Sequence, residues 1–300
     1  MIHVILNATS GARSSPEAPT EIDGLFRGRN AAAEIHYLTD PGDITATVRD
    51  AIAHDPAADV IVAAGGDGTV NAVASALAGQ SIPLGVLPLG TLNHFAKELR
   101  IPLDLPSAVE TIVAGQAVRV DVAQVNDRLF VNNASIGIYP NIVEGRERLR
   151  AQGHRKWPAL VRATIEVMRQ PDDMTIRLDV NGQHAVTRTP FVFVGNNEYQ
   201  VSGFRIGARN QLDQGKLFAY VAPRLPTRDL PKLLMRAIIG RGTDDGQLQI
   251  FSATELWVES FSGRTMKVAC DGEVVTMKTP LHFQSRPGAL NVIVPREGAE

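Results

Sequence analysis

The fold is decided by residues 58–96, ADVIVAAGGDGTVNAVASALAGQSIPLGVLPLGTLNHFA. Residues 59–64 form a short, nearly continuous apolar run, which is typical of a strand buried on both faces of a parallel sheet. The run ends in GGDGT at 65–69, where three glycines let the backbone turn sharply and approach a ligand closely. Apolar residues at helical spacing follow, so this segment predicts a strand, a glycine-rich turn and a helix that ends at Gly79.

A second unit with the same order begins directly behind the first. Residues 84–87 predict a strand, PLGT at 88–91 a turn, and residues 93–99 the start of another helix. Because the carboxyl ends of strands in an open α/β sheet line one crevice, we expect the two glycine turns to lie side by side. A glycine turn that leads into a helix N-terminus holds phosphate on backbone N–H groups, although one such turn alone is equally consistent with a plain tight turn.

Asp67 adds a carboxylate to the first of these turns. A carboxylate beside phosphates is repulsive unless a cation lies between them, so its natural partner is a Mg²⁺-nucleotide. The sequence contains neither GxxxxGK[ST] nor a GxGxxG after its first strand. These two motifs would be expected in a P-loop NTPase and in an ordinary dinucleotide-binding domain, so both classes are excluded.

GGDGTVN at 65–71 and PLGTLNHFA at 88–96 resemble the catalytic domain of the diacylglycerol kinase and sphingosine kinase family, in its bacterial lipid kinase branch. The related NAD kinases share GGDGT, whereas the second block points to the lipid kinases. The resemblance implies an NAD kinase/diacylglycerol kinase-like fold, with an N-terminal doubly wound parallel α/β domain and a C-terminal, mainly antiparallel β domain. It also implies ATP and Mg²⁺ as cofactors and a lipid substrate presented at a membrane surface.

The pattern along the chain agrees with two domains. Strands alternate with helices over residues 1–115, which favours a parallel, doubly wound sheet. We expect a nucleotide-binding domain over 1–120 and a β-rich lipid-substrate domain over 121–288, with a last strand within about 289–300 that returns to the first domain. In the second domain, RLFVNNASI at 128–136 and AVTRTPFVFVGN at 185–196 are each expected to form one strand, and helices are expected near 141–151, 157–169 and 227–239.

Side chains around the two turns complete the implied nucleotide site. The family's Asn-Pro-x-Ser-Gly turn after the first strand is matched by Asn7, Ser10 and Gly11, although a plain turn explains this segment equally well. After the second strand, the turn resembles a family segment in which Thr39 faces the nucleotide. The implied cofactor-binding residues are Asn7, Ser10, Gly11, Thr39, Gly65, Gly66, Asp67, Gly68, Thr69, Asn71, Gly90, Thr91 and Asn93. Asp67 is also the implied metal-binding residue, acting through nucleotide-bound Mg²⁺.

Cys270-Asp271-Gly272-Glu273 lies between two predicted strands. Taken alone, Asp-Gly at this place predicts a type I′ hairpin turn. The family has Asp-Gly-Glu here, with carboxylates that face the crevice. Phosphoryl transfer to an alcohol needs a positioned base, so Glu273 or Asp271 is the expected base, with Glu273 favoured, and Asp67 is the third implied catalytic residue.

Three positions depart from the family pattern and leave alternatives open. Ala8 replaces a proline, His94 stands where an aspartate is usual, and Gln214 replaces the second aspartate of the family's structural Mg²⁺ loop. One alternative is therefore a nucleotide- or lipid-binding protein with weak catalysis. The other is a kinase of a soluble substrate such as NAD, against which the PLGTLNHFA block argues.

Composition limits the partners further. A net charge of −2 gives no electrostatic case for nucleic acid, and the single Cys270 excludes an intramolecular disulfide and fits a reducing compartment. No apolar stretch is long enough to span a bilayer, so we expect a cytoplasmic protein that is at most peripheral at the inner membrane surface. Residues 146–162 carry six Arg or Lys against one Glu beside Trp157, which predicts either a membrane-docking stretch or a solvated helix face.

Overall fold

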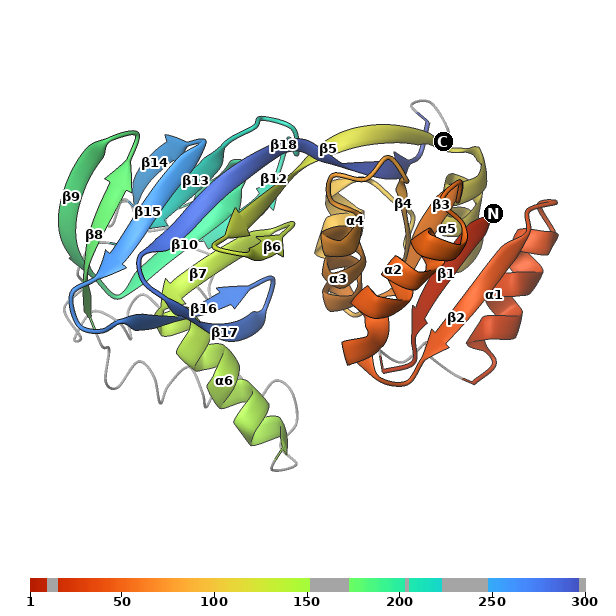
Figure 1. The fold of residues 1–300 in the computed structure, drawn as a ribbon, viewed down its shortest axis with the longest axis horizontal. Coiled ribbons are helices and arrows are strands. Elements are labelled where there is room, and N and C mark those ends of the chain that lie inside the picture. The colour runs from red at the N-terminus through yellow and green to blue at the C-terminus, as the bar shows by residue number, and fades with distance from the viewer. Residues whose placement is uncertain (10–15, 152–172, 203–204, 223–247, 297–300) are drawn as a thin grey trace. The chain divides into compact units, whose positions relative to one another are not determined.

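The computed structural model divides the chain into two compact units (Figure 1). Unit 1 comprises Met1–Val122 and Pro287–Glu300, and unit 2 comprises Ala123–Arg286. The structure describes residues 1–9, 16–151, 173–202, 205–222 and 248–296. The helices expected at 157–169 and 227–239, and the basic residues around Trp157, lie outside the described residues.

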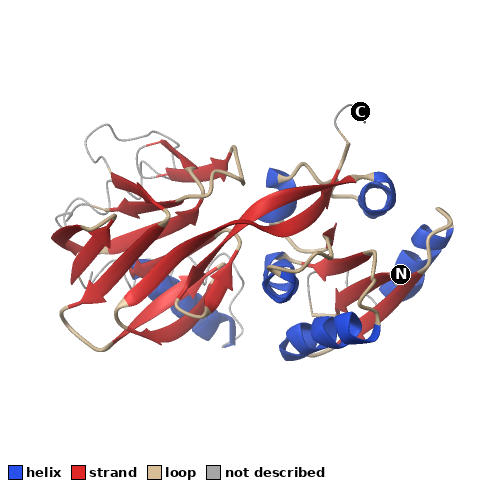
Figure 2. Ribbon diagram, turned by 45° about the horizontal axis from the view of Figure 1, so that its top comes forward, coloured by secondary structure: helices blue, strands red, loops and turns tan. Residues whose placement is uncertain are grey.

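Unit 1 is a parallel sheet whose strands alternate with helices along the chain (Figure 2). Its elements are β1 (Ile2–Asn7), α1 (Ala18–Arg27), β2 (Ala33–Leu38), η1 (Pro41–Asp43), α2 (Ile44–His54), β3 (Val60–Gly65), α3 (Asp67–Leu77), β4 (Leu84–Pro88), α4 (His94–Glu98) and α5 (Leu105–Ala114). The order across the sheet is β2-β1-β3-β4, and every neighbouring pair is parallel. The C-terminal part of β18 (Leu281–Val294) adds a further parallel partner to β4, with Val292 opposite Leu84.

The central strands of unit 1 are buried on both faces. All residues of β1, β3 and β4 are buried, which explains why their sequences read as apolar runs rather than as alternating patterns. Val4, Val62 and Leu87 pack with Ile22 of α1 and Val109 of α5 in one core cluster. Helices α2 and α3 pack against each other. In addition, α2 packs against β1 and α3 packs against β3. The doubly wound α/β fold expected from the sequence is confirmed.

Unit 2 is a β sandwich of two antiparallel sheets, with one described helix, α6 (Ile138–Ala151). The first sheet has the order β14 (Gln249–Ala253), β13 (Leu217–Val221), β10 (Phe191–Asn196), β7 (Asn133–Gly137), β16 (Thr265–Cys270) and β17 (Glu273–Lys278). The second has the order β18, β15 (Glu255–Ser260), β8 (Met174–Val180) and β9 (Gln183–Thr189). Additional strands are β5 (Gln116–Val125), which pairs with β18 and with β6 (Arg128–Phe130), and the pair β11 (Tyr199–Ser202) and β12 (Arg205–Arg209).

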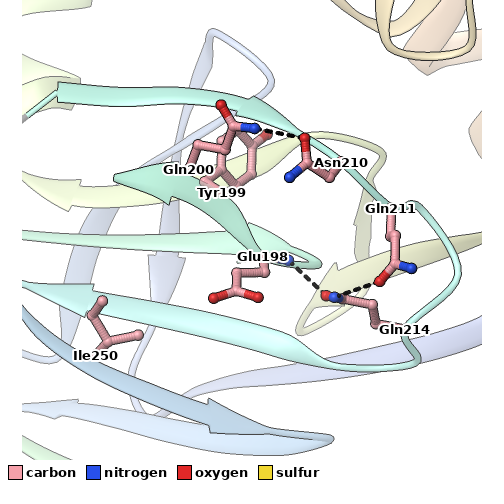
Figure 3. Close-up of a pocket in the computed structure, with 7 residues that line it drawn as sticks. All are labelled: Glu198, Tyr199, Gln200, Asn210, Gln211, Gln214 and Ile250. Carbon is pink, nitrogen blue, oxygen red and sulfur yellow. Dashed lines mark hydrogen bonds between the residues drawn. The ribbon is translucent and has the colours of Figure 1, made fainter. Parts of the chain in front are cut away.

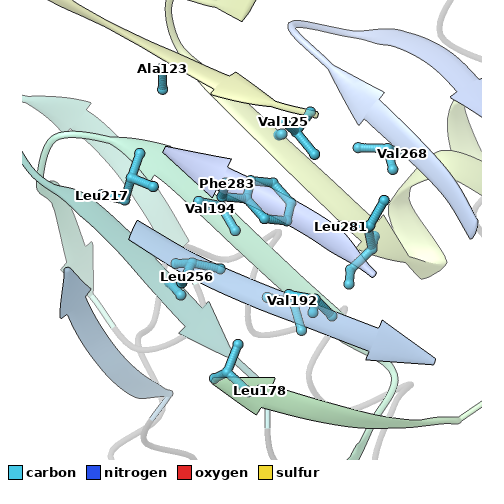
Figure 4. Close-up of a cluster of buried hydrophobic side chains, with 14 of the residues drawn as sticks. Ala123, Val125, Leu178, Val192, Val194, Leu217, Leu256, Val268, Leu281 and Phe283 are labelled. Atoms are coloured by element: carbon cyan, nitrogen blue, oxygen red, sulfur yellow. The ribbon is translucent and has the colours of Figure 1, made fainter. Parts of the chain in front are cut away.

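Side chains from both sheets fill the core of unit 2 (Figure 4). Val192 and Val194 of β10 belong to the same buried cluster as Leu256 of β15 and Phe283 of β18. This shared core makes the two sheets one sandwich, so the expected antiparallel β domain is confirmed.

Two stretches expected to be single strands are each broken. The segment 128–136 divides into β6 and β7 at Val131 and Asn132. The backbone N–H groups of these two residues donate to the Asp271 carboxylate and are not available to a strand ladder. The segment 185–196 divides at Pro190, so that β9 and β10 belong to different sheets. Proline has no N–H group and cannot donate a ladder hydrogen bond. At the residue before it, the Thr189 hydroxyl donates to the Ala222 carbonyl oxygen at 2.7 Å.

Candidate active site

The two glycine turns of unit 1 lie side by side at the carboxyl ends of β3 and β4. Gly65 is paired with Pro88, and its carbonyl oxygen accepts hydrogen bonds from the N–H groups of Leu89 at 2.9 Å and Gly90 at 3.2 Å. A Cβ atom on Gly90 would lie 2.5 Å from the Cα of Gly66, a separation that real Cβ atoms do not adopt. Glycine is therefore required here because the two backbones touch.

The end of β1 joins the same edge of the sheet. The Asn7 amide donates to the Thr69 hydroxyl at 3.0 Å, which connects β1 to the first turn of α3. The Asn7 side-chain oxygen accepts from the Thr9 N–H at 2.9 Å. Both Asn7 and Thr69 are buried, so this pair fixes the backbone that leads into α3.

Asp67 begins α3 and is only partly buried. Its carboxylate accepts one long hydrogen bond from the Phe95 N–H, at 3.5 Å. The helix N-cap, Gly66, has no side chain that could satisfy the first-turn N–H groups. A turn without side chains, followed by the positive end of a helix dipole, fits a phosphate group, and the adjacent carboxylate fits a phosphate-bound cation.

The other residues that the sequence predicts to bind the nucleotide differ from one another in burial and in hydrogen bonding. Asn93 is buried with a left-handed φ of 50°, and its amide donates to the Gly90 carbonyl oxygen at 2.9 Å, so it stabilises the second turn. Asn71 is buried in α3, and its side-chain oxygen has no hydrogen-bond partner among the described residues. Thr39, Gly68 and Thr91 are exposed after β2, β3 and β4, respectively. Ser10 and Gly11 lie outside the described residues.

In unit 2, Asp271 occupies the hairpin turn between β16 and β17. The turn has φ of 46° at Asp271 and 87° at Gly272, the two positive angles that the Asp-Gly pair predicts for type I′. The Asp271 carboxylate accepts three backbone N–H groups, from Val131 at 2.8 Å and from Asn132 and Asn133 at 3.0 Å each. Burial nevertheless raises the pKa of Asp271 to about 6, because desolvation outweighs these three hydrogen bonds.

Arg209 supports this turn from β12 and is 4% exposed. Its guanidinium donates to the carbonyl oxygens of Val131 at 2.7 Å and Asn196 at 2.8 Å, and to the Asn132 side-chain oxygen at 2.8 Å. Its positive charge also lowers the pKa of Asp271, against the larger effect of burial. The sequence did not predict this role, because nothing in its pattern relates a strand arginine to a turn more than seventy positions away.

Replacement of Arg209 by Met is expected to destabilise the protein by about 3 kcal/mol, because buried carbonyl oxygens would lose a charged donor. The measurement is the shift of the urea unfolding midpoint relative to the unsubstituted protein. Arg177→Met is the matched control: its guanidinium donates to an oxygen atom as well, that of the Glu259 carboxylate at 3.0 Å, but both side chains are about half exposed. The control is expected to change stability by less than about 1 kcal/mol, and equal shifts for the two variants would contradict this role of Arg209.

Glu273 lies in more exposed surroundings than Asp271. Its side chain is 59% exposed and forms an ion pair with Arg128. Cys270, directly before the turn, is fully buried, and burial raises the pKa of its thiol to about 12. At Asp271, by contrast, burial raises the pKa of the carboxyl toward neutral pH.

A pocket of about 610 Å³ lies beside β11 in unit 2 (Figure 3). Gln214 lines it and joins two segments, because its side-chain oxygen accepts the Glu198 N–H and its amide donates to Gln211, both at 3.0 Å. This loop corresponds in sequence to the family's structural Mg²⁺ loop, in which Gln214 replaces an aspartate. Asp213 is exposed, and within the described ranges it belongs to no group of three or more metal-capable side chains.

A parallel α/β unit with touching glycine turns, combined with an antiparallel β sandwich, is the architecture of kinases with an NAD kinase/diacylglycerol kinase-like fold. Residues 1–125 match the model of the diacylglycerol kinase catalytic domain, and residues 146–294 match that of the YegS C-terminal NAD kinase beta sandwich-like domain. The chain therefore belongs to the diacylglycerol kinase-like family of bacterial lipid kinases and is a kinase.

Individual relatives agree with this assignment over nearly the whole chain. The chain is 28% identical over 303 residues to a probable lipid kinase YegS-like protein of Pectobacterium atrosepticum, covering 97% of this chain and 96% of that protein. It is 27% identical over 300 residues to a diacylglycerol kinase of Staphylococcus aureus, covering 98% and 92%. The crystal structure of a diacylglycerol kinase from Bacillus anthracis has the same fold, with a TM-score of 0.70 at 20% identity over 98% of this chain and 96% of that one.

The described part of the chain contains no helix that is long and apolar enough to cross a membrane.

Proposed function

We propose that the protein is an ATP-dependent lipid kinase that transfers the γ-phosphate of Mg-ATP to the hydroxyl group of a diacylglycerol-like or sphingoid lipid. The observation that carries the proposal is the contact between the turns after β3 and β4, where a side chain on Gly90 would collide with the backbone of Gly66. Such a turn lets backbone N–H groups surround phosphates closely. The family assignment and the two curated relatives named above support a lipid as the acceptor.

The residues of unit 1 fit Mg-ATP, which supplies the phosphoryl group and neutralises its charge when bound. Backbone N–H groups at 65–69 and that of Thr91 would hold the phosphates, with the Thr69 and Thr91 hydroxyls as further donors. The Gly90 N–H already donates to the Gly65 carbonyl oxygen and holds the two turns together. Neither glycine turn carries a lysine. Asp67 would therefore act on the phosphates through the cation rather than directly.

Asp271 is the better candidate for the base that accepts the proton of the lipid hydroxyl. A carboxylate offers about four lone-pair positions, and three N–H groups occupy three of them, so one on Oδ2 remains for a substrate. A pKa of about 6 also places the group closer to the optimum for a base at neutral pH than an ordinary carboxylate. Glu273, which the sequence favoured, is committed to Arg128 instead.

This assignment predicts the pH dependence of turnover. The base must be ionised, so kcat is expected to fall as the pH drops through about 6, where Asp271 takes up a proton. The measurement is kcat at saturating lipid and nucleotide between pH 5 and 8, with nucleotide affinity recorded over the same range to separate titration of ATP itself. Glu273→Gln is expected to retain the profile. A flat profile, or one that moves only with Glu273→Gln, would contradict Asp271 as the base.

The function is tested by transfer of labelled γ-phosphate in the presence of Mg²⁺ and mixed micelles. Diacylglycerol, monoacylglycerol, sphingosine, ceramide, phosphatidylglycerol and NAD are offered separately. A labelled lipid that disappears in the Asp67→Ala variant would support the proposal and name the substrate. Labelling of NAD alone would replace it by the soluble-substrate alternative, and nucleotide binding with no product from any acceptor would favour the weakly catalytic binding protein.

A further inference from the structure

A cluster of two histidines and two carboxylates lies in unit 1, away from the glycine turns. His3 is near the start of β1, and Glu34 and His36 lie on the neighbouring strand β2, where His3 is directly opposite Glu34. Asp55 caps the C-terminus of α2. The glycine turns follow the opposite ends of the strands, and Asn7 lies four positions after His3 along β1, or about 13 Å away.

The ligand atoms of this cluster have the spacing of a single coordination sphere. The Nδ1 atom of His3 lies 3.3 Å from Nε2 of His36 and 3.6 Å from Oε2 of Glu34. The Nε2 atom of His36 lies 3.9 Å from Oε1 of Glu34. Ligands about 2.0–2.1 Å from a tetrahedral zinc ion are separated from one another by about 3.3–3.4 Å, so only small side-chain rotations are needed. Among the described residues, this is the only group of three such side chains.

Asp55 orients the buried histidine from the other side of its ring. Its Oδ2 atom lies 3.3 Å from Nε2 of His3 and also contacts the N-terminal amine of Met1 at 3.4 Å. A carboxylate accepts hydrogen bonds, so Nε2 of His3 is the donor in this contact. The lone pair of His3 is then on Nδ1, which faces His36 and Glu34. Metal-binding histidines are commonly held by a carboxylate in this way.

The three proposed ligands differ in their exposure to solvent. His3 is 3% exposed, whereas the Glu34 side chain is 52% exposed. The His36 side chain is 23% exposed, between these two values. An ion held by these three side chains would keep a fourth position open to water on the outer side.

We propose that His3, Glu34 and His36 form a binding site for a divalent transition-metal ion of the zinc class, with Asp55 as the carboxylate that orients His3. Imidazole nitrogen and carboxylate oxygen are suitable ligands for such an ion. The ion joins β2, which is the edge strand of the unit 1 sheet, to β1. It stabilises this edge and takes no part in phosphoryl transfer. The competing arrangement is a histidine pair that shares one proton and binds no metal.

The test uses the 300-residue chain without an affinity tag, treated with a chelator and then titrated with Zn²⁺ and with Co²⁺. We expect one ion per chain by elemental analysis, visible absorption from bound Co²⁺, and a melting temperature that rises with Zn²⁺. His36→Asn and Glu34→Gln are each expected to weaken Zn²⁺ binding at least tenfold. His184→Asn is the matched control, because its Nδ1 also lies beside a carboxylate, that of Asp179 at 3.1 Å, but belongs to unit 2.

Either of two results would overturn the proposal: no bound ion in the unsubstituted protein, or the same affinity in His36→Asn and Glu34→Gln as in the control. Circular dichroism without metal checks that each variant is folded. Glu34 is exposed and lies on an edge strand, so Glu34→Gln decides the question even where a histidine variant fails to fold. None of these readouts depends on kinase activity.

Discussion

Asp67→Ala is expected to lower turnover at least about a hundredfold while the protein remains folded, because removal of one group that stabilises transition-state charge has effects of this size. The carboxylate lies beside the glycine turns and, among the described residues, accepts one long hydrogen bond, at 3.5 Å, so the fold depends little on it. Asp67→Asn keeps an oxygen for the Phe95 N–H but removes the charge, and is expected to lose activity to a similar degree. The measurements are kcat for each variant and its urea unfolding midpoint.

Asp104→Ala is the control with the opposite expected outcome. Asp104 also begins a helix, but its carboxylate accepts the Ser107 N–H at 3.0 Å as the N-cap of α5. Loss of this cap is expected to reduce stability by about 1 kcal/mol with little change in turnover. Full activity in Asp67→Ala would refute the proposed role of Asp67 and, with it, the Mg²⁺-nucleotide assignment.

Gly90→Ala is expected to destabilise the protein by about 1–3 kcal/mol and to weaken nucleotide binding at least tenfold, because the methyl group overpacks a backbone contact. The new Cβ would lie 2.5 Å from Gly66 Cα and 2.8 Å from Oδ1 of Asn93. One of the two turns must move, and the N–H groups of both turns would lose their common orientation. Thermal unfolding and equilibrium binding of an ATP analogue measure the two effects separately.

Gly24→Ala in α1 is the matched control for this substitution. A Cβ atom at Gly24 would meet no atom within 4 Å, so the methyl group fits without displacement. Alanine within a helix is expected to stabilise the protein by about 0.5–1 kcal/mol and to leave nucleotide binding unchanged. Unchanged stability and binding in Gly90→Ala would show that the two turns are not held in contact.

The adjacency of the two glycine turns in the candidate site could be predicted from sequence because the parts of each turn are local. Each turn follows a buried apolar strand directly, and neighbouring strands of a parallel sheet end at one edge. The adjacency of the GGDGT and PLGT turns follows from these two rules, and the structure places Gly65 opposite Pro88. The hairpin at Asp271 was equally local, because the Asp-Gly pair alone favours two positive φ angles.

Only the tertiary structure showed what surrounds each polar group. Arg209, Asp271 and the turn at 131–133 are far apart in the chain, and no periodicity relates them. For this reason the sequence favoured Glu273 as the base, whereas the desolvation and free lone pair that favour Asp271 are properties of the folded surroundings. The same holds for the break at Val131, which lies within a segment, 128–136, that the sequence predicted to be one strand.

The sequence by itself determined the class of fold and the location of the glycine turns, since both depend on short patterns of burial and backbone freedom. The family followed from the resemblance of two motifs, GGDGTVN and PLGTLNHFA, to known kinases. The structure decided the environment of each carboxylate and histidine, including the approach of His3 to Glu34 and His36 across two strands. The physical reason is that pKa values and coordination distances depend on desolvation and on neighbours brought together by folding, and these are set by strand register rather than by nearness in sequence.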